Sequence, residues 1–417
     1  MSQQNTDRIQ ITHIGSLPRP HDLLDQIKAK YTGQSYDEQR FDSTLTRAVE
    51  DSIREQTACG IDYVTDGEFS KPGFFSYIQA RLDGFEPRNQ RFPMFEKEVA
   101  AFPEYYAEYF KAAMLGGAAV PMVPMVCVGP VKYKGEALVR TDIANVKAAA
   151  EMAGVPHDHI FLPATAPSGV GRNEYYKSDE EFFHALAAEL GKEYRAIAEA
   201  GLIVQIDDPF LPDLFVDPHL DEKQMKRKAE IYTEATNAAI KGIRPEQIRF
   251  HTCYGINEGP RIYEAALADI IRYVLKVKAG QFSFEAANPR HEHEYHLFED
   301  IKVPDGRVVC PGVITHASNI VEHPELIAER LMRFAKLVGR ENVMAGADCG
   351  FSSQALYRTE VHPTVVWEKF KAMREGADIA TKELWKKRKA AAKPARTAKK
   401  AKVAKKAKTA KRAKKRR

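Results

Sequence analysis

Short apolar runs alternate with amphipathic stretches along most of the chain. Eight runs end in small, polar or metal-binding residues: Ile9–Ser16, Ile61–Glu68, His159–Ala166, Leu202–Asp207, Ile248–Cys253, Gln281–Glu285, Gly312–His316 and Val343–Cys349. Runs of this length predict buried β-strands. A 3.6-residue period between several of them predicts helices over 182–200, 262–278 and 324–338, and the last has proline in its first turn.

Strands that alternate with helices pair in parallel through right-handed crossovers. Eight such units predict a (β/α)8 barrel, in which the active site forms at the C-terminal ends of the strands. An open, doubly wound sheet is the alternative. It has no support as a nucleotide-binding fold, because the chain contains neither Gly-x-Gly-x-x-Gly nor a P-loop motif.

Two segments do not fit the plain repeat. Residues 84–158 are too long for one strand and one helix, and Pro121–Val131 within them predicts an extra strand or hairpin that folds over the barrel mouth. The stretch after Ser16, which includes the acid-rich Tyr36–Gln56, predicts a helical elaboration near the N-terminus.

The charge distribution divides the chain into a body and a tail. The whole chain has 62 Lys+Arg against 57 Asp+Glu, but residues 386–417 hold 18 basic residues and no acidic one. The body therefore carries 44 basic against 57 acidic residues, a net charge of −13. We expect one folded domain over 1–385 and a disordered Lys/Ala-rich tail over 386–417.

Cysteine usage and the first residues of the chain predict where the protein works. Five cysteines have no regular spacing, and the start MSQQNTDRIQ has no apolar signal region. Both features favour a reducing cytoplasm. No run approaches the length of a membrane span, so we expect none.

Four residues at the ends of predicted strands have the chemistry of zinc ligands. They are His251 and Cys253 in HTCYG, Glu285 in FSFEAAN, and Cys349 in GADCGF. Ligands drawn from separate strand ends favour catalytic over structural zinc, because structural sites usually use local Cys-x-x-Cys loops. For any one of them alone, a buried thiol or a core histidine is the commoner interpretation.

The motifs THIGSLPRP, VTDGEF, QIDDP, HTCYG, FEAAN, GVITHASN and ADCGF, in this order, resemble the catalytic C-terminal barrel of cobalamin-independent methionine synthase. The resemblance covers residues 9–375. It implies a monomeric or dimeric zinc-dependent methyltransferase that converts homocysteine to methionine, with Zn²⁺ bound by His251, Cys253, Glu285 and Cys349. Zinc would deprotonate the substrate thiol, and two protein thiolates would keep that sulfur nucleophilic.

The resemblance also implies how homocysteine binds. The matching residues are Ile14, Gly15, Ser16, Glu68 and Asp207. Backbone N–H groups and a hydroxyl suit the substrate carboxylate, and two carboxylates suit its ammonium. His316 matches the family's proposed proton donor, and the ordinary pKa of histidine suits that role. The alternatives are a tight turn at Gly15, a loop start at Asp207, and a histidine that is only hydrogen-bonded.

The donor side departs from the family pattern. Full-length synthases have an additional N-terminal barrel that helps to bind a polyglutamated folate. The family's Arg-Cys pair matches Val126 and Cys127, and the tryptophan expected after the third strand is absent, since the tryptophans of this chain are Trp367 and Trp385. A folate would lose a charged clamp and a stacking surface. We therefore expect another methyl donor, such as a methylated corrinoid or a carrier protein.

Two sequence features keep alternative functions open. Arg19 stands where the synthase has an uncharged residue, and a guanidinium suits a sulfonate, as in the zinc-dependent epoxyalkane:coenzyme M transferases; a surface salt bridge is the other interpretation. NPRHEHEYHLFED has no His-Glu-x-x-His and predicts a polar loop. The Lys-Ala tail lacks aromatic residues and would bind nucleic acid without sequence preference, as in a nucleic-acid-associated protein on a retired enzyme scaffold.

Overall fold

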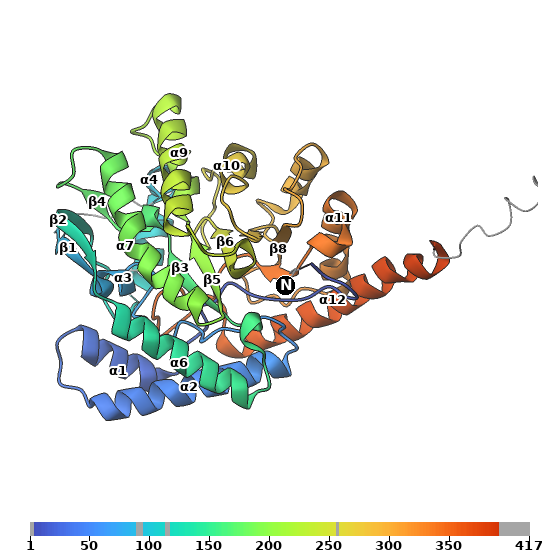
Figure 1. Cartoon of the computed structure of the whole chain (residues 1–417), viewed down its shortest axis with the longest axis horizontal. Helices are drawn as coiled ribbons and strands as arrows, with labels where there is room; N and C mark the ends of the chain where they lie inside the picture. The colour runs from blue at the N-terminus through green and yellow to red at the C-terminus, as the bar shows by residue number, and fades with distance from the viewer. Residues whose placement is uncertain (1–3, 89–94, 113–116, 256–257, 392–417) are drawn as a thin grey trace, which may run out of the picture.

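The computed structural model describes residues 4–88, 95–112, 117–255 and 258–391 (Figure 1). Its α-helices are α1 His21–Tyr31, α2 Glu38–Ala58, α3 Tyr77–Arg81, α4 Glu96–Ala101, α5 Pro103–Ala112, α6 Glu136–Met152, α7 Asp179–Glu199, α8 Phe210–Leu214, α9 Glu222–Ala239, α10 Leu267–Val274, α11 Pro324–Val338 and α12 Pro363–Ala391. Its strands are β1 Leu82–Pro87, β2 Met125–Tyr133, β3 Phe161–Thr165, β4 Arg172–Asn173, β5 Ile203–Asp207, β6 Ile248–Thr252, β7 Gln281–Phe284, β8 Val308–Ile314 and β9 Gly346–Ala347.

Six strands form a curled parallel sheet in the order β3-β5-β6-β7-β8-β9. Two extended segments close it. Ile11 bridges in parallel to Ala345 beside β9, and Val64 bridges in parallel to Ile160 beside β3. The backbone N–H of Asp62 donates to the carbonyl of Ile11 at 3.0 Å, which joins the two segments to each other. The predicted α/β barrel with eight strand positions is confirmed.

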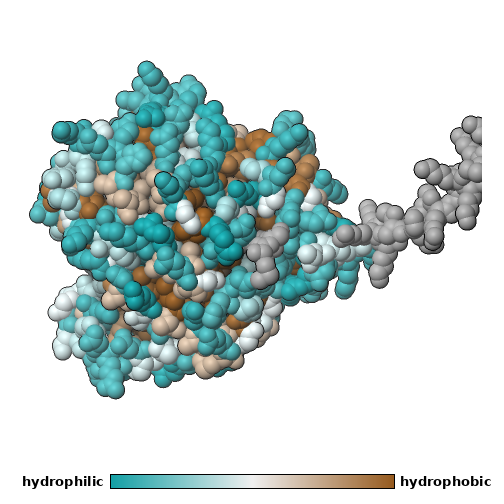
Figure 2. Space-filling view, in the orientation of Figure 1, coloured by the Kyte–Doolittle hydropathy of each residue, from teal (hydrophilic) through white to brown (hydrophobic). Residues whose placement is uncertain are grey.

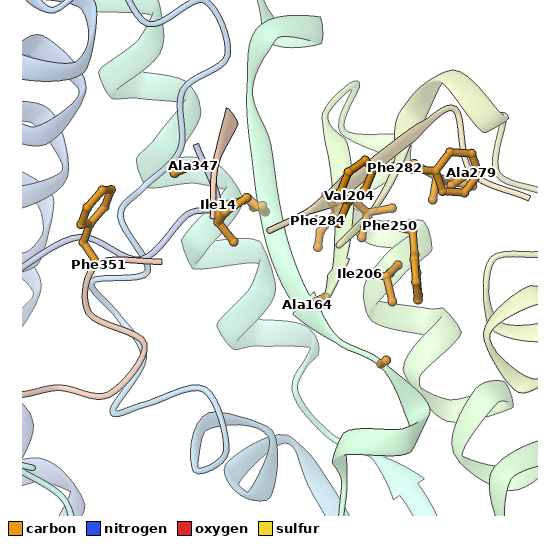
Figure 3. Packing of buried hydrophobic residues seen from close by; sticks show 14 of the residues in the cluster. Ile14, Ala164, Val204, Ile206, Phe250, Ala279, Phe282, Phe284, Ala347 and Phe351 are labelled. Atoms are coloured by element: carbon orange, nitrogen blue, oxygen red, sulfur yellow. The ribbon is translucent and has the colours of Figure 1, made fainter. Parts of the chain in front are cut away.

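Side chains alternate between the two faces of the barrel strands. Figure 3 shows Val204, Phe250 and Phe282 close together on neighbouring strands, within the buried apolar cluster. The residues next to them, Gln205, Arg249 and Gln281, are fully buried on the other face and lie in register with one another. The barrel therefore has an apolar layer towards its helices and a polar layer inside.

The helices begin at residues that satisfy their free N–H groups. Ser178 accepts a hydrogen bond from the N–H of Glu181 at the start of α7, and Asp221 forms a capping box with Gln224 at the start of α9. The predicted helix 324–338 is confirmed by α11. The predicted helix 262–278 is too long, because the chain before α10 is a loop in which Arg261 has a positive φ of 56°.

The segment between the second barrel strand and α6 supplies an extra sheet and a cover. β1 and β2 pair antiparallel, and β2 also pairs with β4, so the extra strand predicted at 121–131 is confirmed. Glu98 of α4 accepts from the N–H of Tyr263, after β6, at 2.8 Å. Tyr109 of α5 donates to Glu360, after β9. These bonds place α4 and α5 over the C-terminal ends of the strands, a position that was predicted for the strand or hairpin at 121–131.

Near the N-terminus, α1 and α2 form the predicted helical elaboration, and α2 packs against α6 and α12. The first barrel segment is also anchored by the end of the chain. The N–H of Ile9 donates to the hydroxyl of Thr381 at 3.0 Å, and Arg374 donates to the carbonyl of Ile9 at 3.2 Å, both from α12. The N-terminal segment therefore needs the last helix to hold it in place.

The long helix α12 extends from the barrel and continues through Ala391, past the predicted domain boundary after Trp385 (Figure 1). The rest of the predicted tail, from residue 392, lies outside the described residues, and its contact with nucleic acid stays a prediction. The face shown in Figure 2 is covered mostly by hydrophilic side chains. Among the described residues, every helix is too short or too polar to span a membrane.

Candidate metal and substrate site

Three of the four predicted metal ligands meet at the C-terminal ends of the strands. The ligand atoms of His251, Cys253 and Cys349 lie within 4.8 Å of one another, and all three residues are buried. The two sulfur atoms are 3.1 Å apart and do not form a disulfide. We call these three residues the metal cluster. One imidazole nitrogen and two sulfurs are donors that zinc accepts in proteins, so the residues fit that ion.

The strands of the barrel orient the histidine of the metal cluster. His251 lies on β6 opposite Ser283 of β7, whose hydroxyl is 3.2 Å from Nδ1. Nε2 is buried and has no hydrogen-bond partner in the part of the chain that the structure describes. Burial, followed by the charge of Arg249, lowers the pKa of His251 to about 3. The imidazole is therefore neutral and can offer Nε2 to a cation.

Glu285, the fourth predicted ligand, lies beside the metal cluster but outside it. Its Oε1 accepts from the N–H of Tyr254 at 3.2 Å. Its Oε2 accepts from Arg261 at 2.8 Å and from Asn288 at 2.6 Å. The carboxylate is thus occupied by protein donors.

A buried ionic network surrounds the Arg261 partner of Glu285. Arg261 also pairs with Glu264, and His291 lies 3.1 Å from Glu264 and 2.8 Å from Glu294. Burial alone would lower the pKa of His291, but its hydrogen bonds to these two carboxylates raise it to about 9. The histidine-rich segment is therefore more than the polar loop predicted for it, since His291 supports the surroundings of Glu285.

Asp348 shapes the loop that carries Glu285. Its carboxylate accepts from the backbone N–H groups of Ala286 and Ala287 at 2.8 and 2.7 Å and of Asn288 at 2.9 Å. Gly312 makes room for it, because a Cβ there would lie 2.0 Å from Oδ1 of Asp348. Asp348 directly precedes Cys349, so one side chain fixes the loop of Glu285 relative to the metal cluster.

Two buried carboxylates of the predicted homocysteine site, Glu68 and Asp207, lie next to the metal cluster and are called the acid pair. Asp207 is paired in register with His251. Burial, followed by the negative charge of Glu68, raises the pKa of Asp207 well above its usual value. Each carboxylate has a fixed donor, since Lys71 lies 3.2 Å from Glu68 and Gln205 donates to Asp207 at 2.8 Å.

The end of the first strand joins the acid pair to the metal cluster. Gly15 has φ +132°, and a Cβ there would lie 2.4 Å from Pro163 and 3.2 Å from a carboxylate oxygen of Glu68. Ser16 accepts from the N–H of Ser352 at 3.4 Å, and its Oγ leaves no room for a Cβ at Gly350, next to Cys349. Ile14 is buried and accepts from Gln205.

Arg19 lies in the interior and not on the surface, and its binding of a sulfonate stays a prediction. It is buried, and it donates to the carbonyl of Ser352 at 2.8 Å and to the carbonyl of Glu68 at 2.7 Å. Burial lowers its pKa to about 10. The predicted surface salt bridge is therefore wrong. Instead, the guanidinium joins the backbone at Ser352 to the backbone at Glu68.

His316 is buried beyond the end of β8. Neither ring nitrogen has a hydrogen-bond partner among the described residues. Burial, followed by the charge of Arg261, lowers its pKa to about 4. The expectation of an ordinary histidine pKa is therefore wrong, and the imidazole is neutral near pH 7.

On the predicted donor side, Val126 and Cys127 are buried in β2, where they pair with Glu86 and Phe85 of β1. Sequence reasoning missed three buried cations around the site: Lys71, Arg249 and Arg261. Lys71 sits three residues after Glu68, a spacing that suits an ion pair. Arg261 has the same kind of signal, because Glu264 follows it by three residues. Arg249 has none, since its partners come from distant parts of the sequence.

The sequence matches a known protein family over most of its length. Residues 9–375 match the family model described as the catalytic domain of cobalamin-independent synthase. A methionine synthase of Thermococcus kodakarensis is 26% identical over 375 residues, which cover 89% of this chain and 93% of the relative. A methionine synthase of Sulfolobus acidocaldarius is 24% identical over 343 residues, covering 81% and 84% of the two chains.

Solved structures have the same fold. A B12-independent methionine synthase from a Shewanella species, in complex with selenomethionine, has a TM-score of 0.69 at 20% identity and covers 90% of this chain and 99% of that one. A putative vitamin-B12 independent methionine synthase from Listeria monocytogenes has a TM-score of 0.62 at 19% identity, with the same coverage.

Proposed function

The chain belongs to the family of cobalamin-independent synthase catalytic domains, and from that premise we propose that it methylates homocysteine to methionine with a zinc ion at the metal cluster. The observation that carries the proposal is the meeting of three ligand atoms within 4.8 Å, directly beside the acid pair. His251, Cys253 and Cys349 would hold zinc, and Glu285 is the fourth candidate. When bound, zinc would lower the pKa of the substrate thiol.

The residues around the metal cluster suit an amino acid that carries a thiol. Asp207 and Glu68 would receive the substrate ammonium, and Ser16 with the neighbouring backbone N–H groups would receive its carboxylate. Both carboxylates are buried, so they would bind the ammonium in a place from which water is excluded. This arrangement favours homocysteine over a thiol that lacks an amino group.

In the proposed reaction, the thiolate sulfur forms a bond to the methyl carbon of the donor. The bond between that carbon and the donor breaks, and the donor leaves with the electron pair. A donor that leaves as a basic nitrogen takes up a proton, which balances the one that the thiol released. His316, with two unpartnered ring nitrogens among the described residues, is the candidate that relays this proton. It would act as a neutral imidazole, since its pKa is lowered to about 4.

We infer the class of methyl donor from the absence, in this sequence, of the charged and stacking residues expected to hold a folate. Val126 is a buried, uncharged residue of β2. It offers a folate neither an ionic contact nor an aromatic surface for stacking. We expect poor turnover with free methyltetrahydrofolate and faster turnover with a methylated corrinoid or a methyl carrier protein.

The test is a methylation assay with the purified full chain, homocysteine and a panel of methyl donors, together with metal analysis. We expect about one zinc per chain and methionine as the product with at least one donor. Fast turnover with free methyltetrahydrofolate would overturn the donor argument. Binding of a sulfonated thiol without binding of homocysteine would move the assignment to alkyl transfer of the coenzyme M type.

A further inference from the structure

A single arginine lies inside the barrel beneath the proposed site. Arg249 is fully buried on β6, two residues before His251, and its guanidinium lies 4.4 Å from the ring centroid of Phe161. Among the described residues, no carboxylate accepts a hydrogen bond from it. A buried charge without an ionic partner is costly, and an apolar side chain would fill a barrel interior at lower cost. This position therefore calls for a functional reason.

The partners of Arg249 come from β5, β7 and the first barrel segment. Nε donates to Oε1 of Gln281 at 2.6 Å, and Nη1 donates to Oε1 of Gln205 at 3.1 Å and to the carbonyl of His13 at 3.3 Å. The His13 carbonyl directly precedes the predicted substrate segment Ile14–Ser16, and Gln205 lies two residues before Asp207. One guanidinium thus touches the supports of both parts of the predicted homocysteine site.

The chemistry of the guanidinium fixes which way the Gln205 amide faces. Arginine has only donors, so the amide oxygen of Gln205 must point towards Arg249. The amide nitrogen then points the other way, where it donates to Oδ1 of Asp207 at 2.8 Å and to the carbonyl of Ile14. A flipped amide would place its N–H₂ group against the guanidinium and its oxygen against the carboxylate.

We propose that Arg249 is a positioning residue for the substrate: through the Gln205 amide it holds Asp207 as a hydrogen-bonded carboxylate that receives the ammonium of the thiol substrate. This inference rests on the proposed function, because it concerns the same amino-acid site. It assigns Arg249 no contact with the substrate or with the metal. A purely structural arginine would stabilise the barrel equally for every ligand, whereas a positioning residue acts only on ligands that carry an ammonium.

The test compares two thiols in the zinc-loaded full chain with Gln205→Glu. The new carboxylate pairs with Arg249 and keeps the barrel interior filled, but it presents an oxygen instead of an N–H to Asp207. Homocysteine should bind at least about tenfold more weakly, because two acceptors now face each other. The affinity for 4-mercaptobutanoate, which has the same thiol and carboxylate but no amino group, should fall several-fold less, because it is affected only through the lost bond to the carbonyl of Ile14.

Two further variants complete the design. Arg249→Met should give the same selective loss of homocysteine, and Arg249→Lys should recover part of it because it keeps a donor. Gln247→Glu is the matched control. Gln247 donates to the carbonyl of Ala198 at 2.7 Å and lies before the start of β6, whereas Asp207 lies at the end of β5.

The outcomes separate this inference from the proposed function. Equal loss of both thiols in Gln205→Glu and Arg249→Met would show a structural role, and unchanged homocysteine binding in both would also overturn the inference. A wild-type protein that binds 4-mercaptobutanoate as tightly as homocysteine would instead sink the amino-acid site itself. If Gln205→Glu does not fold, Arg249→Lys against wild type gives the same comparison of the two thiols.

Discussion

The metal cluster and the acid pair lie at the ends of neighbouring strands, but they differ in how many of their polar atoms have protein partners. His251 keeps Nε2 without a partner among the described residues, and the thiols of Cys253 and Cys349 contact each other. In contrast, each carboxylate of the acid pair already has a protein donor, Lys71 for Glu68 and Gln205 for Asp207. The metal cluster thus keeps a nitrogen that can bind an ion, whereas the acid pair is held in place by the fold.

We infer that the metal cluster contributes mainly to the free energy of ligand binding and the acid pair mainly to the free energy of unfolding. Changes in the metal cluster should alter ligand affinity and leave the folded state nearly as stable as before. Removal of the cation that supports the acid pair should instead lower the free energy of unfolding, because it leaves a buried charge without compensation. Four experiments test this contrast.

The largest effect is expected for Cys349→Ser. A serine hydroxyl is a poor zinc ligand, so the zinc affinity should fall on the order of a thousandfold or more, measured by competition with a chromophoric chelator. The free energy of unfolding of the metal-free protein should change by less than about 1 kcal/mol. Cys59→Ser is the control, because that buried thiol contacts the carbonyl of Trp367 instead. Unchanged zinc affinity would exclude Cys349 as a ligand.

Lys71→Met should destabilise the fold. Both members of the Lys71–Glu68 pair are buried, and removal of one partner from such a pair costs about 3 to 5 kcal/mol. Urea unfolding of the metal-free protein measures it. Lys192→Met provides the control, because Lys192 is half exposed and pairs with Glu189, and should cost less than about 1 kcal/mol. Equal costs for the two variants would break the contrast between the two regions.

His291 should make stability depend on pH. Its folded-state pKa of about 9 lies above the unfolded value of 6.5, so its contribution is fully present below pH 6.5 and is lost as the pH rises through 9. The lost contribution is roughly 3 kcal/mol. His291→Gln should remove this dependence in urea unfolding of the metal-free protein, and the exposed His296→Gln should not. A wild-type slope that survives in His291→Gln would refute the assignment.

The smallest effect is expected for Ser283→Ala. The hydroxyl only orients the imidazole of His251, and loss of such a support lowers metal affinity about tenfold. Chelator competition measures the change, and Ser43→Ala, on the exposed side of α2, is the control. An effect as large as that of Cys349→Ser would mean that the serine does more than orient the ring.

The sequence predicted the barrel well because its information is local. Each strand end carries its own polar residue after an apolar run, as Asp207 and His251 do, so alternation predicted the barrel and the edge at which these residues meet. The candidate metal ligands themselves were chosen from their donor chemistry and from the family resemblance. The helix expected over 262–278 is shorter, Leu267–Val274, for a tertiary reason. Arg261 adopts a left-handed conformation and pairs with Glu285, which holds the chain out of the helix.

Buried cations could not be predicted in the same way. From the sequence, Arg249 would be expected to face solvent, because a charged side chain in a strand is usually exposed to water. Its acceptors are 44, 32 and 236 residues away in sequence, and only the closed barrel brings them together. The same holds for Arg19, whose acceptor at Ser352 is 333 residues distant.

The anchoring of the first strand by α12 has a consequence for synthesis on the ribosome. Ile9 and Ile11 leave the exit tunnel several hundred residues before their partners Ala345 and Thr381 are made. Until then, the opening strand is an apolar segment with an unpaired edge, and loops of several hundred residues must close before it is covered. The barrel can therefore close only late in folding, once these distant partners have been made.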